Sequence, residues 1–398
     1  MASQNLVTKH AVKQITQNQS SFASAKKEDA LEVYNKMPQP KEKDEDWRYT
    51  QIEKLKLENF ENGAAEAKIE AFANFEELES KGVILEDINS ALDKYPAAQN
   101  YFFKNTKIDK DKFVALCAAQ FTNGVYIYVP KNVELKEPIR INFSFSGKKS
   151  AIHNLIVCEA NTKIDFIEEY SNIPSDSEQL NACVTEVFAN NNSKINFYHL
   201  NNWTSQVYNF TNVIGTAERD ASINWISGSF GGKLNRLRID TLFNGQGSGC
   251  SNLGVFLGKG KEHIDITTNV YHNVEGTTND IMVDGILRDE SSSVYRGLIR
   301  IEKIAQKTNS YLANHILKLG DKTLANSIPS LKIDANDVKA SHGATVGQIS
   351  EEHLFYLMAR GLSRDEAEKM IVEGFFEPII MKIPNEELRE KIREKVKK

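Results

Sequence analysis

The residues with the clearest chemical potential lie around position 342, where a histidine stands among small residues. The segment Ala340–Gly347 reads Ala-Ser-His-Gly-Ala-Thr-Val-Gly, and strand-like sequence gives way to helical sequence close to it. An imidazole without bulky neighbours can offer a nitrogen to a metal ion or to a partner molecule. By residue type alone, a loop histidine bonded to nearby backbone is the competing interpretation. The segment itself does not decide between these two roles.

Other residues that bind metals or act as nucleophiles are dispersed. His263, His272 and His315 are not at a tight ligand spacing, which favours structural roles, and His353 is expected at the surface of a helix. The acidic residues at 280, 284, 289 and 290 are irregularly spaced and are expected in solvated turns. The four cysteines form no Cys-x-x-Cys pair, and in a reducing compartment free thiols in or near the core are expected. They are Cys117, Cys158, Cys183 and Cys250.

Two glycine-rich strings, at 228–232 and 245–249, invite comparison with phosphate-binding loops. Neither ends in Gly-Lys-Ser/Thr, and neither leads into a helical pattern. Both therefore predict tight turns between strands, and we expect no ATP site in this chain. No Ser/His/Asp order or G-x-S-x-G elbow supports hydrolytic chemistry either.

Composition narrows the class of protein. Of the 398 residues, 40% are hydrophobic and 26% charged, and the net charge is -5. This balance is that of an ordinary globular protein, and it lacks the basic excess of a nucleic-acid or membrane-surface binder. The first 20 residues are polar, and no run is long enough to span a bilayer. We therefore expect a cytoplasmic protein.

From residue 113 onward, apolar residues alternate with polar ones, which predicts strands. Three similar hexapeptides, at 161–166, 192–197 and 220–225, recur about every 30 residues. Their shared isoleucines are Ile164, Ile195 and Ile223, with Leu253 as the suggested next member. Units of this kind bury their apolar side chains only by stacking on copies of themselves. The pattern favours a mainly β fold with a right-handed parallel β-helix, and a β-sandwich is the alternative.

Helical sequence is expected on both sides of this core. Residues 1–110 are assigned to an N-terminal helical region, 111–345 to the β-helical core and 346–398 to a C-terminal helical region. Within the first region, helices are expected at 28–36, 72–78 and 88–95. In the last region Ser350 is an N-cap followed by two acids, Gly361 is a helix end, and Ser363 to Glu366 is a capping box. A charged terminal helix is expected from Asn385.

The C-terminal pattern resembles the SufB/SufD family of iron–sulfur cluster assembly. The resemblance lies in Ser341–Gly347, in Leu354–Gly361 (Leu-Phe-Tyr-Leu-Met-Ala-Arg-Gly) and in Ile371–Phe375 (Ile-Val-Glu-Gly-Phe). Near the N-terminus, Asp46–Thr50 also resembles the Trp-Arg-Tyr-Thr element of that family. SufB-like members carry His-Glu-Ala-Thr-Thr at the signature and a cysteine shortly upstream. Here glycine follows His342 and no cysteine follows Cys250, so the SufD-like members are the better match.

The resemblance implies a non-catalytic scaffold subunit and a set of partners. A SufB-like subunit is expected to pair through the β-helix, and a SufC-like ABC-type ATPase to dock on the C-terminal helices. His342 becomes the candidate contributor to a transient iron–sulfur cluster site shared with the partner subunit. Some relatives have a cysteine two residues earlier, where this chain has Ala340. The expected docking residues are Leu354, Phe355, Tyr356, Arg360, Met370 and Phe375.

Two other functions stay open at this point. The first is a SufB-like homodimeric scaffold with SufC, which the cysteine-free C-terminal third disfavours. The second is a β-helical enzyme acting on polysaccharide, which predicts a secreted source and clustered carboxylates. The absence of an apolar signal-like stretch in the first 20 residues argues against it.

Overall fold

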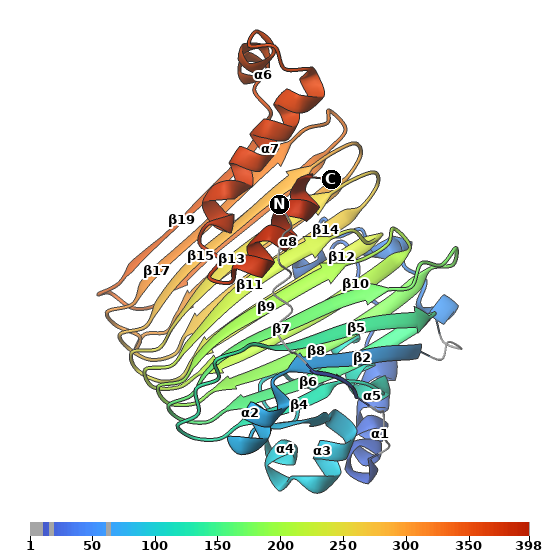
Figure 1. The fold of residues 1–398 in the computed structure, drawn as a ribbon, viewed down its shortest axis with the longest axis vertical. Coiled ribbons are helices and arrows are strands. Elements are labelled where there is room, and N and C mark those ends of the chain that lie inside the picture. The colour runs from blue at the N-terminus through green and yellow to red at the C-terminus, as the bar shows by residue number, and fades with distance from the viewer. Residues whose placement is uncertain (1–10, 16–19, 61–64, 398) are drawn as a thin grey trace, which may run out of the picture.

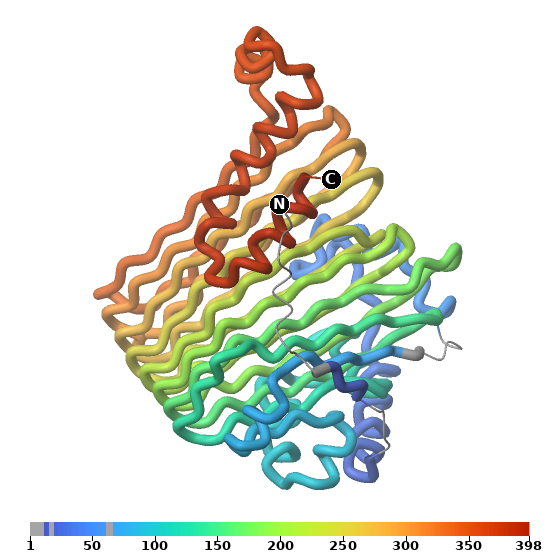
Figure 2. The backbone as a smooth tube through the Cα atoms, viewed as in Figure 1, coloured from blue at the N-terminus to red at the C-terminus, as the bar shows by residue number. Residues whose placement is uncertain are grey.

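A computed structural model describes residues 11–15, 20–60 and 65–397, so most of the polar N-terminal segment lies outside the described residues. The chain forms a parallel β-helix with helices at both ends (Figure 1). From β4 onward, strands alternate between two sheets, and eight mutually parallel strands of each sheet stack as eight turns. Figure 2 shows these turns following one another in sequence order. The predicted β-helix is therefore confirmed, and the β-sandwich alternative is wrong.

The two sheets contain, within the described residues, ten and nine strands. Sheet A consists, in spatial order, of β1 (Ala11–Gln14), β2 (Ala65–Ala73), β5 (Ile139–Gly147), β7 (Lys163–Asn172), β9 (Lys194–Asn202), β11 (Ser222–Phe230), β13 (Gly249–Gly258), β15 (Thr278–Leu287), β17 (Asn309–Lys318) and β19 (Lys339–Gln348). Sheet B consists of β18 (Leu324–Ile333), β16 (Ser292–Ile301), β14 (His263–His272), β12 (Leu234–Phe243), β10 (Val207–Ala217), β8 (Gln179–Ala189), β6 (Lys149–Cys158), β4 (Val125–Val129) and β3 (Ile84–Asp87).

The repeat in the sequence corresponds to the register of sheet A. Ile164, Ile195 and Ile223 are paired in consecutive strands and are all fully buried. The next member of this row is Cys250, and Leu253 instead pairs with Ile226. The suggested continuation through Leu253 is therefore wrong. The turns differ in length by a few residues, so extrapolating a fixed period misses the register.

The first residue of each repeat unit forms the turn that precedes a strand. Asn161, Asn192 and Asp220 have φ angles of 59°, 56° and 56°. Asparagine and aspartate tolerate this left-handed conformation better than other non-glycine residues do. The Asn192 side-chain amide also donates to Asn161 Oδ1 at 2.9 Å, which links one turn to the next. The hexapeptides thus combine a turn residue with the first inward-facing residue of a strand.

The N-terminal region is less helical than expected, because two of its strands pair with the first turn of the β-helix. β2 runs antiparallel to β5, and β3 antiparallel to β4. The inward-facing Ala67, Ile69 and Ala71 of β2 alternate with polar residues, a pattern of period two. The helix expected at 72–78 therefore begins only at Phe75. The helical elements are α1 (Ser21–Lys36), η1 (Glu45–Trp47), η2 (Ile52–Lys54), η3 (Leu57–Phe60), α2 (Phe75–Ser80), α3 (Ile88–Lys94), α4 (Pro96–Tyr101), η4 (Ile108–Lys110) and α5 (Lys112–Gln120).

The C-terminal helices are α6 (Glu351–Met358), α7 (Arg364–Ile380) and α8 (Glu386–Lys397). The predicted caps are present, since Ser350 accepts from the His353 amide and Ser363 forms a full capping box with Glu366. Apolar residues of α7 and α8, such as Val372, pack on the outer face of sheet A. α6 projects beyond the last turn of the β-helix (Figure 1). Among the described residues, no helix combines the length and apolar character needed to cross a membrane.

A buried carboxylate attaches the N-terminal segment to the outer face of sheet B. Asp265 on β14 accepts from Arg236 Nη1 at 2.7 Å and Arg296 Nη1 at 2.8 Å, and also from the Thr50 hydroxyl. Burial alone would raise the pKa of Asp265, but the two arginines and Thr50 outweigh burial and lower it. The Arg236 guanidinium also lies 3.9 Å from the centre of the Trp47 ring. The Asp46–Thr50 element is thus held by three neighbouring strands.

We predict that Asp265→Asn lowers the free energy of unfolding by about 3–5 kcal/mol, because it leaves two buried guanidinium groups without a counter-charge. Urea unfolding followed by circular dichroism measures this loss, and limited proteolysis should show earlier cleavage near residue 47. The matched control is Asp334→Asn, which removes a half-exposed partner of Arg300 and should cost no more than about 1 kcal/mol. Equal losses for the two variants would contradict the role assigned to Asp265.

Candidate functional site

His342 lies within a strand, not in the junction that the sequence predicted. It occupies β19, which continues six residues beyond it to Gln348, and it pairs with Leu312 of β17. Leu312 is fully buried in the core between the sheets. Paired residues of parallel strands point to the same face, so the imidazole belongs to an inward-facing row. Because β19 is the last strand of sheet A, no described strand stacks on it and His342 is exposed.

Most inward-facing side chains of β19 and of the second half of β18 share this exposure, and we call the inward-facing side chains of β18 and β19 the open end. Leu331, Ile333 and Val346 continue rows that are buried in the preceding turns. Here they are 37%, 38% and 44% exposed. Pro329 stands in the middle of β18, as is acceptable on an edge strand. The open end is therefore an apolar surface with one imidazole in it.

Thiols lie elsewhere in the described chain. Cys117, Cys158, Cys183 and Cys250 are all buried, as expected, and none is in a disulfide. Burial raises the pKa of Cys117, Cys158 and Cys250 to about 12 and also raises that of Cys183, so the thiols stay protonated. Cys250 shares its row with Ala340 but is three strands away, roughly 14 Å at the usual strand spacing. Among the described residues, no group of three His, Cys, Asp or Glu side chains could hold a metal ion.

His263, His272 and His315 each have a hydrogen-bonding partner, in line with their expected structural roles. His263 Nδ1 lies 2.8 Å from Ser292 Oγ, and burial lowers the pKa of His263 to about 4. His272 is bonded through both nitrogens, and burial lowers its pKa to about 4 as well. His315 Nδ1 lies 2.8 Å from Asp284 Oδ1 on the outer face of sheet A. Asp284 therefore lies within β15 and is paired, so the expectation that it lies in a solvated turn is wrong.

The sequence reasoning missed a polar cluster inside the β-helix. Glu168 and His199 are both buried, and His199 Nδ1 lies 2.6 Å from Glu168 Oε1. Tyr170, Asn154 and Thr185 also donate to this carboxylate, at 3.0, 3.2 and 3.3 Å. The alternating pattern contains a signal for this cluster. Glu168 and His199 stand two residues after the inward-facing Phe166 and Phe197, so they also face inward. A charged residue in that phase predicts a buried partner one turn away.

The residues expected to dock an ATPase have different degrees of exposure. Phe355 and Tyr356 on α6 are 73% and 57% exposed, and Met370 on α7 is 52% exposed. Arg360 is also exposed and donates to the Tyr356 hydroxyl at 3.1 Å. Phe375 is partly covered. Leu354 is almost fully buried, so in this conformation it is not available to a partner.

A bidentate ion pair connects α6 to α7. Arg364 Nη1 and Nη2 donate to the two carboxylate oxygens of Glu351 at 3.1 and 2.7 Å. Both side chains are at least half exposed, so the pair contributes little to stability. Its geometry nevertheless fixes the orientation of the exposed α6 residues relative to α7.

Comparison with known proteins identifies the class. The SufBD core domain of SUF system FeS cluster assembly matches residues 142–375, and the SufBD protein N-terminal region matches 69–141. The chain therefore belongs to the SufB/SufD family of iron–sulfur cluster assembly proteins. The SufD protein of Bacillus subtilis is 30% identical over 322 residues, 80% of this chain and 74% of that protein. SufBD family proteins of Staphylococcus saprophyticus and Staphylococcus epidermidis are each 29% identical over 78% of this chain and 67% of theirs. Within the family, this chain is SufD-like.

We predict that two histidine substitutions differ strongly in their effect on stability. His199→Ala leaves the buried Glu168 carboxylate without its imidazole and should lower the free energy of unfolding by about 3–5 kcal/mol. His342→Ala removes an exposed side chain and should change it by no more than about 0.5 kcal/mol. Thermal and urea unfolding of the isolated chain compare the two. A large loss in His342→Ala would mean that this residue has a structural role.

Proposed function

We propose that this chain is the SufD-like scaffold subunit of a SUF complex. In this proposal it pairs with a SufB-like subunit through the open end of its β-helix and docks a SufC-like ATPase on α6 and α7. It catalyses no reaction itself, and the ATPase supplies the nucleotide hydrolysis. The iron–sulfur cluster is the cargo of the assembly, which works in the cytoplasm.

The observation that carries the pairing proposal is the exposure of inward-facing rows at the open end. Leu331, Ile333 and Val346 are apolar members of rows whose other members are buried. A stacked strand from a second chain would bury them as each turn buries the one before it. Such an interface gains the free energy of apolar burial, at roughly 25 cal/mol per Å² of surface removed from water.

His342 would then lie inside the interface rather than at its rim. Its exposed imidazole can donate one ligand to a cluster while the partner subunit supplies thiolates, which are the usual soft ligands of iron and sulfide. The thiols of this chain are buried in α5 and in earlier turns of the β-helix, so the proposal takes those ligands from the partner. Ala340 stands where some relatives have cysteine, which is consistent with the partner subunit supplying the thiolates.

The docking proposal rests on the exposed aromatic side chains of α6. Aromatic residues beside an arginine are typical of residues that dominate binding energy in protein interfaces. Phe355 and Tyr356 on α6 form such a group with Arg360 in the turn after it, and α6 projects from the body of the protein. Ser350, the N-cap of α6, is two residues beyond the end of β19. A movement of a docked ATPase could therefore be transmitted to the strand that carries His342.

We predict that His342→Ala forms the complex normally but reduces its cluster content several-fold. The measurement is anaerobic co-expression with SufB-like and SufC-like partners, followed by iron and sulfide determination and absorption spectroscopy. Ser341→Ala, at the exposed outward-facing neighbour on the same strand, is the control and should retain its cluster. Full cluster content in His342→Ala would disprove the role of His342. A homodimer of this chain with no SufB-like subunit would favour the homodimeric alternative.

We further predict that Phe355→Glu combined with Tyr356→Glu abolishes retention of the ATPase. Two charges replace the exposed rings, while the buried Leu354 that anchors α6 is left intact. Affinity co-purification and light scattering measure the loss. The control is Met381→Glu, which is similarly exposed at the end of α7 and should retain the ATPase. Normal retention by the double variant would place the dock elsewhere.

A further inference from the structure

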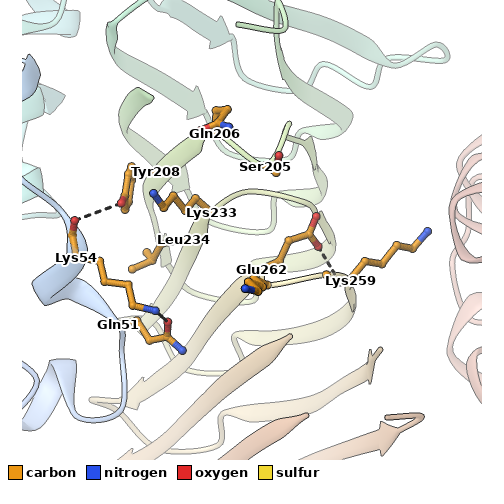
Figure 3. A pocket seen from close by; sticks show the side chains of 11 residues that line it. Gln51, Lys54, Ser205, Gln206, Tyr208, Lys233, Leu234, Lys259 and Glu262 are labelled. Carbon is orange, nitrogen blue, oxygen red and sulfur yellow. Dashed lines mark hydrogen bonds between the residues drawn. The ribbon is translucent and has the colours of Figure 1, made fainter. Parts of the chain in front are cut away.

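A recess lined by lysines lies between the N-terminal segment and sheet B, away from the open end and α6. Its walls are η2 and the turns that precede β10, β12 and β14 (Figure 3). The cavity has a volume of about 430 Å³, enough for a small organic molecule. Neither the family signature nor the proposed partner surfaces include it.

The side chains that line this recess carry an excess of positive charge. Lys54, Lys233, Lys259 and Lys261 line it, against one carboxylate, Glu262. The chain as a whole has a net charge of -5, so this local excess runs against the overall composition. A cleft lined by charges of one sign concentrates counter-ions of the other.

The lysines are only partly neutralised by the protein. Lys233 Nζ lies 2.5 Å from Glu178 Oε1 and Lys261 Nζ lies 3.8 Å from Glu290 Oε2, but the described contact of Lys54 Nζ is the neutral amide oxygen of Gln51 at 2.5 Å. Among the described residues, no carboxylate lies within ion-pair distance of the ammonium groups of Lys54 and Lys259. Burial lowers the pKa of Lys259, and nearby Arg288 lowers it further, so this charge is held without full compensation.

The lining carboxylate is already engaged by the backbone. Glu262 Oε2 accepts from the Lys259 amide at 2.8 Å, and burial raises the pKa of Glu262. It therefore stabilises the turn before β14 and is poorly placed to neutralise the side chains of Lys54 and Lys233. In Figure 3 these two lysines lie with Tyr208 on one side of the recess, and the Lys259 side chain extends away on the other.

The remaining lining indicates the kind of anion. Tyr208 and Leu234 form an apolar floor, and Gln51, Ser205 and Gln206 offer polar groups around it. Lysine ammonium groups beside neutral hydrogen-bond donors suit the oxygens of a phosphate group. From these features we propose that the recess binds a phosphorylated small molecule. Its phosphate lies between Lys54 and Lys233, and its organic part lies on Tyr208 and Leu234.

The test is isothermal titration of the full-length chain, purified alone, with inorganic phosphate, pyrophosphate and adenosine diphosphate. The double variant Lys54→Gln/Lys233→Gln should bind pyrophosphate and adenosine diphosphate at least 10-fold more weakly than the wild type. The matched control is Lys107→Gln/Lys131→Gln, which removes the same charge from exposed lysines outside the recess and should bind as the wild type does. Circular dichroism checks that both variants are folded.

Three results would overturn the proposal. They are no saturable binding of any of the three ligands at millimolar concentration, equal affinity in the wild type and the recess variant, and equal weakening in both double variants. The last would indicate general attraction to positive charge. Tighter binding of adenosine diphosphate than of pyrophosphate would support contact between the organic part of the ligand and the apolar floor. Equal affinities would overturn that contact, and the recess would then bind the phosphate group only.

Discussion

The structure depends on one constraint, which is that each turn of the β-helix buries its inward-facing side chains only against the next turn. Ile164, Ile195 and Ile223 show this directly, since each is fully buried between neighbours in the same row. A two-strand unit alone could not exclude water from these residues. Stability is therefore a property of neighbouring pairs of turns, and the two ends of the stack are necessarily different from its middle.

The chain treats its two ends differently. At the first turn, β2 and β3 pair antiparallel with β5 and β4, and Leu78 and Val83 add to the core there. At the last turn, no described strand pairs with the outer edge of β18 or of β19, and much of their inward-facing rows is exposed. Exposed sheet edges favour strand addition and are usually shielded in proteins that act alone. The asymmetry is the physical basis for proposing a partner at one end only.

The sequence could predict the core because its period is local, whereas the site depends on contacts across turns. Alternation and the repeated Asn-x-x-Ile units indicate parallel stacking, and Ser350 and Ser363 mark helix starts that the structure contains. Leu253 was placed in the wrong row because turn lengths vary. The contact of Asp265 with two arginines and the Asp46–Thr50 element could not be predicted from local patterns, because these groups are up to 250 residues apart in the sequence. Leu354 looked like a docking residue because burial within a small helical pair depends on tertiary packing.

The position of His342 at the end of a buried row is itself an argument about chemistry. The row of His342 is buried in all preceding turns, and its members include Phe166, Phe197, Trp225, Asn252, Ile281 and Leu312. A further turn stacked on β19 would remove the imidazole from water. Burying a polar group without a partner costs several kcal/mol, so a stacked chain would have to supply a hydrogen bond or a metal ion. An alanine or leucine would serve better if the interface were only adhesive. A histidine at this point of the row therefore favours an interface that supplies a polar partner to the imidazole, and the proposed cluster site would be one such partner.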